Sequence, residues 1–466
     1  MEMKALVIGL DGASPLLIEK WIEDLPIFKK FKNEGSWGSS VPPIPAQTPV
    51  AWTTFMTGKN PGKHGIFSFA MRKPRTYERR IISPSMIGSK TLWRILSEYG
   101  KRVGVLNVPM ADLEEINGFM IPGFLAKSEG VPHPLELKGK LERKFGTMEK
   151  VAGDVETHVL EKVKSDPDYF FSRVDEMTDN LGEISLYLLR EEKWDFFMVV
   201  FMGTDRIQHF FWKYMDESHP KYEENEYNAK AKKYYEKLDK IISRFLEAKP
   251  TDALTIVMSD HGFCPVWQEV ILNNYLQEHG MLKTKDGKID LEKSRAVSYG
   301  YGDIWLNVEG REPRGILRPG GEYEAAREEI IQTLENLKID DEKPIKRVEK
   351  RENIYWGSHV NEAPDLTAIF NRGWQAARHP EIETTRRQDK KYVVEKPRWS
   401  GGHDGTHDPL DVPGILGLLG PRIPKRKKLR VYLWDLAPTI LKLMNIPVPM
   451  DMDGKPMPVA STNKEM

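Results

Sequence analysis

Three apolar runs in this chain each lead into an aspartate, at Asp11, Asp205 and Asp260. Runs rich in β-branched and apolar residues are typical of strands buried on both faces of a parallel sheet. Open α/β sheets bind their ligands at the carboxyl ends of such strands, where these acids would lie. A single aspartate there is more often a turn or cap residue. Three of them, two with a histidine close behind, favour a site for divalent metal ions.

Two histidines accompany these acids. His209 follows Asp205 by four residues, so both would share one face of a helix and could bind one metal ion. His261 directly follows Asp260 and would add a nitrogen ligand beside a carboxylate oxygen. The alternative for His209 is a packed core histidine, because an aromatic run begins at Phe210. The spacing favours the metal interpretation.

Thr48 is the candidate nucleophile. It stands before Pro49 at the start of an expected helix, and Gly58 lies just past the end of that helix. A helix N-terminus favours a phosphate-like anion through its free N–H groups and its dipole. A threonine hydroxyl needs a metal ion to lower its pKa before it can attack at neutral pH. The alternative is that Thr48 is a plain helix cap, and the two roles are compatible.

A late glycine-rich loop, Ser-Gly-Gly-His-Asp-Gly-Thr-His-Asp, contains His403 and His407. Such a loop can bend an imidazole toward a metal ion, and histidine is a common zinc ligand. A solvent-exposed loop histidine is the alternative, and we expect it for one of the two.

Strand and helix signals alternate along the chain, which indicates an α/β fold with a mostly parallel sheet. The expected strands include Lys4–Leu10, Arg102–Val108, Trp194–Met202 and Leu254–Met258. The expected helices include Pro15–Asn33, Asp166–Arg190 and Tyr222–Lys249. No Gly/Ser linker divides the chain, so we expect one catalytic domain over residues 1–466. Residues 110–180 and 265–400 are interpreted as insertions or lid segments within it.

Composition narrows the possible partners. The chain has 466 residues, with 69 Lys plus Arg against 69 Asp plus Glu, so its net charge is zero. This balance argues against bulk nucleic acid or an acidic membrane surface as the partner. Cys264 is the single cysteine, which excludes an internal disulfide and a cysteine-based zinc site and favours a reducing compartment. Without a signal peptide or a long apolar run, the sequence predicts a cytoplasmic protein that does not enter the membrane.

Taken in order, the motifs resemble the alkaline phosphatase superfamily, and most of all its type I phosphodiesterase/nucleotide pyrophosphatase branch. They are Asp11 after the first strand, Gln-Thr-Pro-Val-Ala-Trp-Thr-Thr-Phe-Met-Thr-Gly, Pro-Gly-Lys-His-Gly-Ile, Asp-Arg-Ile-Gln-His, Ser-Asp-His-Gly and Gly-Thr-His. The ordered set covers nearly the whole chain and is more specific than any one motif. It implies an alkaline phosphatase-like three-layer sandwich with a mostly parallel central sheet and inserted lid segments.

The resemblance also implies a site with two divalent metal ions, usually zinc, with manganese as the alternative. Carried over residue by residue, one ion would be held by Asp11, Thr48, Asp260 and His261. The other would be held by Asp205, His209 and a late histidine. The Gly-Thr-His motif favours His407 as this late ligand. His403 would then lie near the metal ion without binding it.

The mechanism that the resemblance implies is an in-line attack by Thr48, which forms a phospho-threonine that water then hydrolyses. Two metal ions about 4 Å apart would clamp the phosphoryl oxygens. One departure concerns the asparagine that extracellular nucleotide pyrophosphatases carry after the His-Gly-Ile stretch, because Phe69 stands at that position here. The contacts to the phosphoryl group must therefore differ, which weakens the case for nucleotide substrates.

We therefore expect a metal-dependent hydrolase of small-molecule phosphoric esters, preferably phosphodiesters or nucleotide pyrophosphates. A phosphotransferase or mutase and a phosphomonoesterase are the alternatives within the superfamily. A non-catalytic binding protein with this fold is a further alternative, which the complete ligand set and the intact Thr48 argue against. The sequence carries no signal for the natural substrate, the identity of the metal ions or the oligomeric state.

Overall fold

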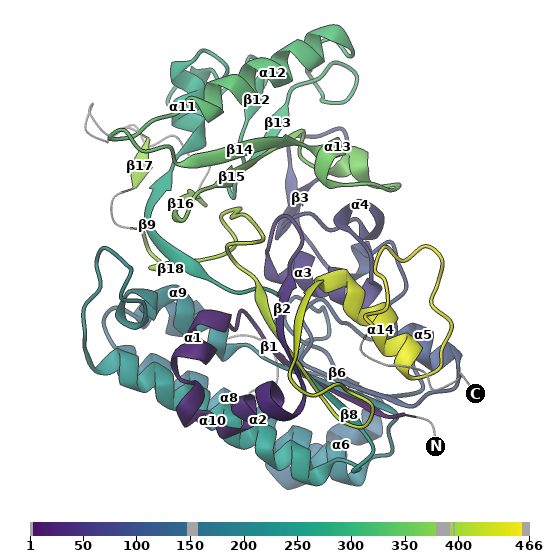
Figure 1. Cartoon of the computed structure of the whole chain (residues 1–466). Helices are drawn as coiled ribbons and strands as arrows, with labels where there is room; N and C mark the ends of the chain where they lie inside the picture. Colours follow the sequence, from purple (N-terminus) through teal and green to yellow (C-terminus); the bar gives the residue numbers. More distant parts are fainter. Residues whose placement is uncertain (1–2, 147–156, 379–391, 395–396, 459–466) are drawn as a thin grey trace.

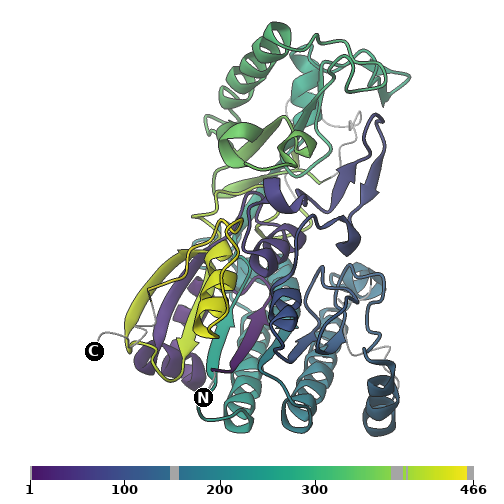
Figure 2. The same cartoon turned by 90° about the vertical axis from the view of Figure 1, so that its right-hand side faces the viewer.

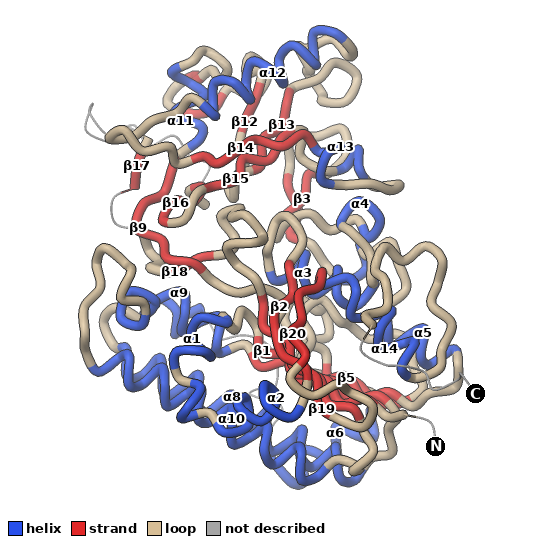
Figure 3. Tube along the Cα trace, viewed as in Figure 1, coloured by secondary structure: helices blue, strands red, loops and turns tan. Residues whose placement is uncertain are grey.

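The computed structural model describes residues 3–146, 157–378, 392–394 and 397–458. An eight-stranded sheet lies at its centre, drawn in red in the lower half of Figure 3. The strand order across this sheet is β20 (Lys427–Tyr432), β2 (Ser36–Val41), β19 (Gly414–Leu419), β8 (Leu254–Met258), β1 (Ala5–Leu10), β7 (Phe196–Phe201), β5 (Val103–Leu106) and β6 (Gly118–Ile121). β19 runs antiparallel to both its neighbours, whereas the other strands run parallel to one another.

Helices cover both faces of the sheet because its strands are apolar on both sides. In β1, Leu6 and Ile8 belong to one hydrophobic core, and Ala5 and Val7 belong to the other. The first core is completed by α1 (Pro15–Lys20), α2 (Pro26–Glu34), α6 (Leu135–Phe145), α7 (Thr157–Lys162), α8 (Pro167–Glu191), α9 (Gly203–Met215) and α10 (Glu226–Ala248). The second is completed by α3 (Thr48–Thr57), α5 (Leu92–Glu98) and α14 (Leu436–Leu443). The predicted three-layer sandwich is thus confirmed (Figure 1).

A second body of structure stands above the sandwich and has a hydrophobic core of its own (Figure 2). Its antiparallel sheet contains β12 (Ala296–Val297), β13 (Asp303–Leu306), β15 (Leu366–Phe370) and β14 (Ile345–Lys350). Its helices are α11 (Leu272–Glu278), α12 (Gly321–Glu335) and α13 (Arg351–Ile354). A second sheet connects it to the sandwich through β9 (Cys264–Val270), which pairs with β16 (Gly373–Ala376), β17 (Val393–Val394) and β18 (Gly401–Gly402).

Smaller elements complete the described chain. They are α4 (Pro61–His64), the hairpin of β3 (Ala70–Arg72) and β4 (Arg79–Ile81), the hairpin of β10 (Thr284–Lys285) and β11 (Lys288–Ile289), and the 3₁₀ turns η1 (Ile22–Asp24), η2 (Pro84–Met86), η4 (Val360–Glu362) and η5 (Leu433–Asp435). None of the described helices is both long and apolar enough to cross a membrane.

Two expectations are refined by the structure. The single helix expected over Pro15–Asn33 is divided into α1, η1 and α2. The break before α2 arises because Pro26 lacks an N–H group and keeps the preceding Leu25 out of a helical conformation. The range 110–180, interpreted as insertion or lid, supplies the edge strand β6 and the helices α6 and α7 of the first core. Those parts of the range belong to the sandwich.

The start of α2 depends on a carboxylate from another helix. The side chain of Leu25, the residue before the helix, makes no capping hydrogen bond. Asp239 of α10 instead accepts hydrogen bonds from the backbone N–H groups of Ile27 and Phe28, both at 3.0 Å. Because this carboxylate is buried, the bonds join two helices of the same layer.

We expect Asp239→Ala to lower the free energy of unfolding by about 1–3 kcal/mol, because it leaves the first N–H groups of α2 without an acceptor. Urea denaturation followed by circular dichroism measures the change. Glu223→Ala, at an exposed loop position, is the matched control and should have little effect. Equal stability of the two variants would show that the cap contributes nothing.

Candidate active site

The three strand-end aspartates converge because β8, β1 and β7 are neighbours that run in the same direction. Asp260, Asp11 and Asp205 follow these strands at their common carboxyl edge. None of the three side chains is more than 1% exposed. Gly12 N–H donates to Asp260 Oδ1 at 3.1 Å and so connects the loops after two of the strands. The sheet therefore concentrates three buried carboxylates in one place.

Thr48 reaches this cluster from the first residue of α3, which follows β2. Its hydroxyl oxygen lies 3.5 Å from Asp11 Oδ1 and 3.4 Å from His261 Nε2. The indole N–H of Trp52 donates to Asp11 Oδ2 at 2.7 Å and fixes the carboxylate. Trp52 lies one helical turn after Thr48, so both side chains leave α3 on the same face. The first turn of α3 thus supplies the hydroxyl and orients the acid beside it.

Three histidines are held so that one nitrogen of each faces the cluster. Each Nδ1 lies at hydrogen-bond distance from a backbone carbonyl oxygen, at 3.1 Å for His209 and Gly401, 3.2 Å for His261 and Gly262, and 2.7 Å for His403 and Ala46. A carbonyl oxygen can only accept, so each Nδ1 carries the proton and each Nε2 keeps a lone pair in the neutral ring. Carbonyl bonds of this kind orient histidines that bind metal ions.

The free nitrogens meet the carboxylates in two groups. In one, Asp205, His209 and His403 offer ligand atoms that all lie within 4.8 Å of one another. His403 Nε2 is 3.1 Å from Asp205 Oδ1 and 3.2 Å from His209 Nε2. In the other, Asp11, Asp205 and His261 converge to the same degree. Asp260 adjoins this second group, with Oδ2 at 3.2 Å from His261 Nε2.

The electrostatics of the cluster suit a cation. Burial, followed by the charges of Asp260 and Asp205, raises the pKa of Asp11 well above its usual value. Burial is also the main cause that raises the pKa of Asp260 to about 8, and its Oδ2 accepts no hydrogen bond from the described residues. Burial lowers the pKa of His209 to about 3 and keeps this imidazole neutral, as metal binding requires. Divalent ions would neutralise the carboxylates and use the free lone pairs, so the residues fit two metal ions.

The structure places His403, and not His407, beside Asp205 and His209. The chain turns at Thr406, whose φ of 61° lies in the left-handed region, and His407 then forms a β-bridge with Phe370 in β15. His407 is fully buried, belongs to neither group of ligand atoms, and neither of its ring nitrogens has a hydrogen-bond partner among the described residues. His403 therefore occupies the position that the Gly-Thr-His motif led us to expect for His407.

Three further residues of the site were not foreseen. Trp52 could have been found from its four-residue spacing to Thr48. Arg206 lies next to Asp205 in sequence, and its guanidinium Nη1 is 3.0 Å from Asp205 Oδ2. The Trp399 ring packs against that of His209 with centroids 3.6 Å apart and planes tilted by 36°, a contact across long sequence distance that no local pattern reveals.

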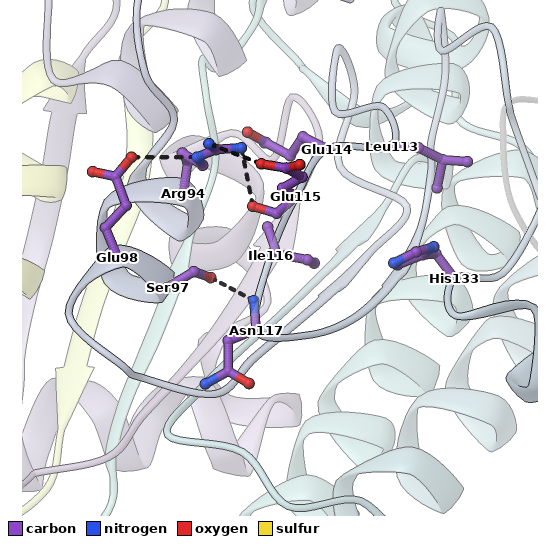
Figure 4. A pocket seen from close by; sticks show the side chains of 9 residues that line it. All are labelled: Arg94, Ser97, Glu98, Leu113, Glu114, Glu115, Ile116, Asn117 and His133. Atoms are coloured by element: carbon purple, nitrogen blue, oxygen red, sulfur yellow. Dashed lines mark hydrogen bonds and ion pairs between the residues drawn. The ribbon is translucent and has the colours of Figure 1, made fainter.

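A wide pocket of about 810 Å³ lies elsewhere, between α5 and the segment 113–117 (Figure 4). Its charged groups satisfy one another, because Arg94 pairs with Glu98 and Glu115, and Ser97 accepts a hydrogen bond from the backbone N–H of Asn117. None of the residues of the two metal-ligand groups lines it. We therefore place the candidate active site at the carboxyl edge of the sheet.

Comparison with known proteins agrees with this geometry. The sequence profile of a family described as type I phosphodiesterase/nucleotide pyrophosphatase matches residues 5–406. None of the curated protein sequences compared with the chain matches it. Among solved structures, murine ectonucleotide pyrophosphatase/phosphodiesterase 5 is similar with a TM-score of 0.59 and 16% identity, over 96% of each chain. The human counterpart has a TM-score of 0.59 and 15% identity, over 97% of each chain.

Metal analysis can show which of the two late histidines, His403 or His407, binds a metal ion. We expect His403→Ala to lose about one equivalent of divalent metal per chain, because it removes a nitrogen from the group around Asp205. His407→Ala removes an equally buried imidazole and should keep its metal content. Inductively coupled plasma mass spectrometry after dialysis measures the difference, and thermal melts verify that both variants fold. Loss of metal from the His407 variant alone would reverse the assignment.

Proposed function

Because the chain belongs to the type I phosphodiesterase/nucleotide pyrophosphatase family, in the alkaline phosphatase superfamily, we propose that it hydrolyses phosphoric esters through Thr48 at a two-metal site. One observation carries the proposal. The Thr48 hydroxyl stands at a helix N-terminus within 3.5 Å of both an aspartate and the unprotonated nitrogen of a histidine. This arrangement suits a hydroxyl that must become a nucleophile beside a bound anion.

Two divalent ions fit the ligand groups. The proposed ligands of one ion are Asp11, Thr48, Asp260 and His261. The proposed ligands of the other ion are Asp205, His209 and His403. Histidine nitrogens and carboxylate oxygens in such numbers are typical of zinc, with manganese as the alternative. When bound, the ions supply positive charge that lowers the pKa of the threonine hydroxyl and stabilises the phosphoryl oxygens.

The residues of the chain then have separate tasks. Asp11, fixed by Trp52, and His261 hold the Thr48 oxygen in place for an in-line attack on phosphorus. The free N–H groups and dipole of α3 favour the phosphoryl oxygens as charge develops on them. The bond from phosphorus to the leaving alcohol breaks, and the phosphoryl group is left on Thr48. Attack by water on this phosphorus releases the product and restores the hydroxyl.

A relative supports the role of the threonine. One murine ectonucleotide pyrophosphatase/phosphodiesterase 5 structure is of an inactive threonine-to-alanine variant in complex with AMP.

For the present chain we propose small-molecule phosphodiesters as preferred substrates. At the position of the asparagine of extracellular pyrophosphatases, the Phe69 ring packs 6.2 Å from that of Tyr301, and the backbone N–H of Phe69 donates to Gln47 Oε1. The phenyl ring of Phe69 has no N–H or O–H group and cannot donate a hydrogen bond to a phosphoryl oxygen.

We expect Thr48→Ala to reduce the rate of bis-p-nitrophenyl phosphate hydrolysis by the metal-loaded protein about 10³-fold or more, because the nucleophile is removed. Release of p-nitrophenol measures the rate, and metal content should remain largely intact. The control is Thr57→Ala, which removes a buried hydroxyl from the other end of α3, where it donates to the carbonyl oxygen of Thr53. Full activity of the Thr48 variant would exclude Thr48 as the nucleophile.

A phosphotransferase or mutase is the alternative, since Thr48 could pass its phosphoryl group to an alcohol. For a hydrolase, reaction in ¹⁸O-water places the label in the phosphate monoester product, because water attacks the phosphorus. Mass spectrometry of the product in the presence of glycerol measures the partition between water and alcohol. Dominant formation of glycerol phosphate esters without label would favour the transferase.

A further inference from the structure

A second pocket of about 500 Å³ lies beside α9, where α9 meets the first turn of α10 and the strand β9. Much of its wall is aromatic. The aromatic lining residues are Phe210, Phe211, Tyr214, Tyr227, Trp267 and Trp399. Within the wall, Tyr227 packs against Phe211 and Tyr214 with ring centroids 5.1 and 5.3 Å apart. Phe210, Tyr214, Tyr227 and Trp267 are only half-buried, so their rings leave apolar surface on which a planar ring can stack.

The same wall is strongly basic. Its cationic residues are Lys164, Lys213, Lys221 and Arg398, and none of the described lining residues is acidic. Lys213 Nζ lies 4.5 Å from the ring centroid of Tyr214, and the guanidinium of Arg398 lies 5.9 Å from that of Phe210. Neither forms an ion pair with a carboxylate in the described parts of the chain. In a protein with no net charge, this is a local excess of positive charge.

We propose that this pocket binds a small aromatic phosphate, such as a nucleoside monophosphate, at a site separate from the metal centre. The rings supply stacking surfaces for the planar part, and the lysines and arginine supply the counter-charge for the phosphate. The volume lies within the usual range for small-molecule sites. The proposal goes beyond the hydrolase function, because binding here requires neither Thr48 nor a metal ion.

The pocket and the metal centre are neighbours that share a wall. Trp399 lines the pocket and packs against His209, a proposed metal ligand. No member of the two metal-ligand groups is itself among the lining residues. Trp399 is 7% exposed, and its indole N–H has no hydrogen-bond partner among the described residues. The shared wall thus holds a buried donor without a partner in the described part of the chain.

Isothermal titration calorimetry of the full-length protein with AMP tests the proposal after the metal ions have been removed with EDTA. We expect one saturable site per chain in the metal-free protein. Inorganic phosphate and adenosine, which each carry half of the ligand, should bind about tenfold or more weakly than AMP. AMP binding that appears only after metal ions are restored would place the ligand at the metal centre and overturn the proposal. Phosphate binding as tight as that of AMP would overturn the role of the rings.

Charge reversal in the pocket provides the matched variants. Lys213→Glu combined with Arg398→Glu should weaken AMP binding by metal-free protein about tenfold or more. Lys30→Glu, on the exposed face of α2, is the control and should bind as the unchanged protein does. Circular dichroism and thermal melts establish that the double variant folds. Unchanged affinity in a folded double variant would overturn the proposal. Diesterase activity is measured separately, so failure of this site leaves the assignment of Thr48 unaffected.

Discussion

The burial of three carboxylates at one edge of the sheet is the constraint on which the rest of the site depends. Neighbouring strands lie only about 4.8 Å apart, so acids that follow β8, β1 and β7 cannot avoid one another. Removing such charges from water costs several kcal/mol each unless a partner compensates. Within the described chain, Arg206 supplies one cation at Asp205. The remaining charge calls for metal ions, and the surrounding groups are those that metal ions bind.

The second body of structure contributes to the site through its connection to the sheet. The chain passes from Asp260 and His261 directly into β9, and β18 pairs back onto β9 immediately before His403. The backbone carbonyl of Gly401 in β18 also accepts a hydrogen bond from Nδ1–H of His209. One pair of strands therefore orients histidines from two separate parts of the chain. This arrangement explains how an excursion of more than a hundred residues can separate ligands of the same cluster.

The sequence predicted those parts of the site that local rules determine. Asp11, Asp205 and Asp260 follow directly from apolar strands and the parallel-sheet rule, and the α/β class with a mostly parallel sheet follows from the alternation of elements. The three-layer sandwich was implied by the family resemblance. The choice between His403 and His407 lay beyond such rules. It depends on a left-handed backbone at Thr406 and on a bridge to Phe370, which are long-range properties of the folded chain. The contact between Trp399 and His209 could not be predicted for the same reason.

Although the chain has no net charge, its positive and negative side chains are unevenly distributed in space. Around the metal centre, buried carboxylates exceed the cations that touch them, whereas the pocket beside α9 has cations and no acid among its described lining residues. His209 and Trp399 lie between the two regions as neutral rings packed against each other. A neutral partition prevents direct pairing of the opposite charges, so each region keeps an unbalanced field. The acidic region then attracts metal ions, and the basic pocket attracts anions.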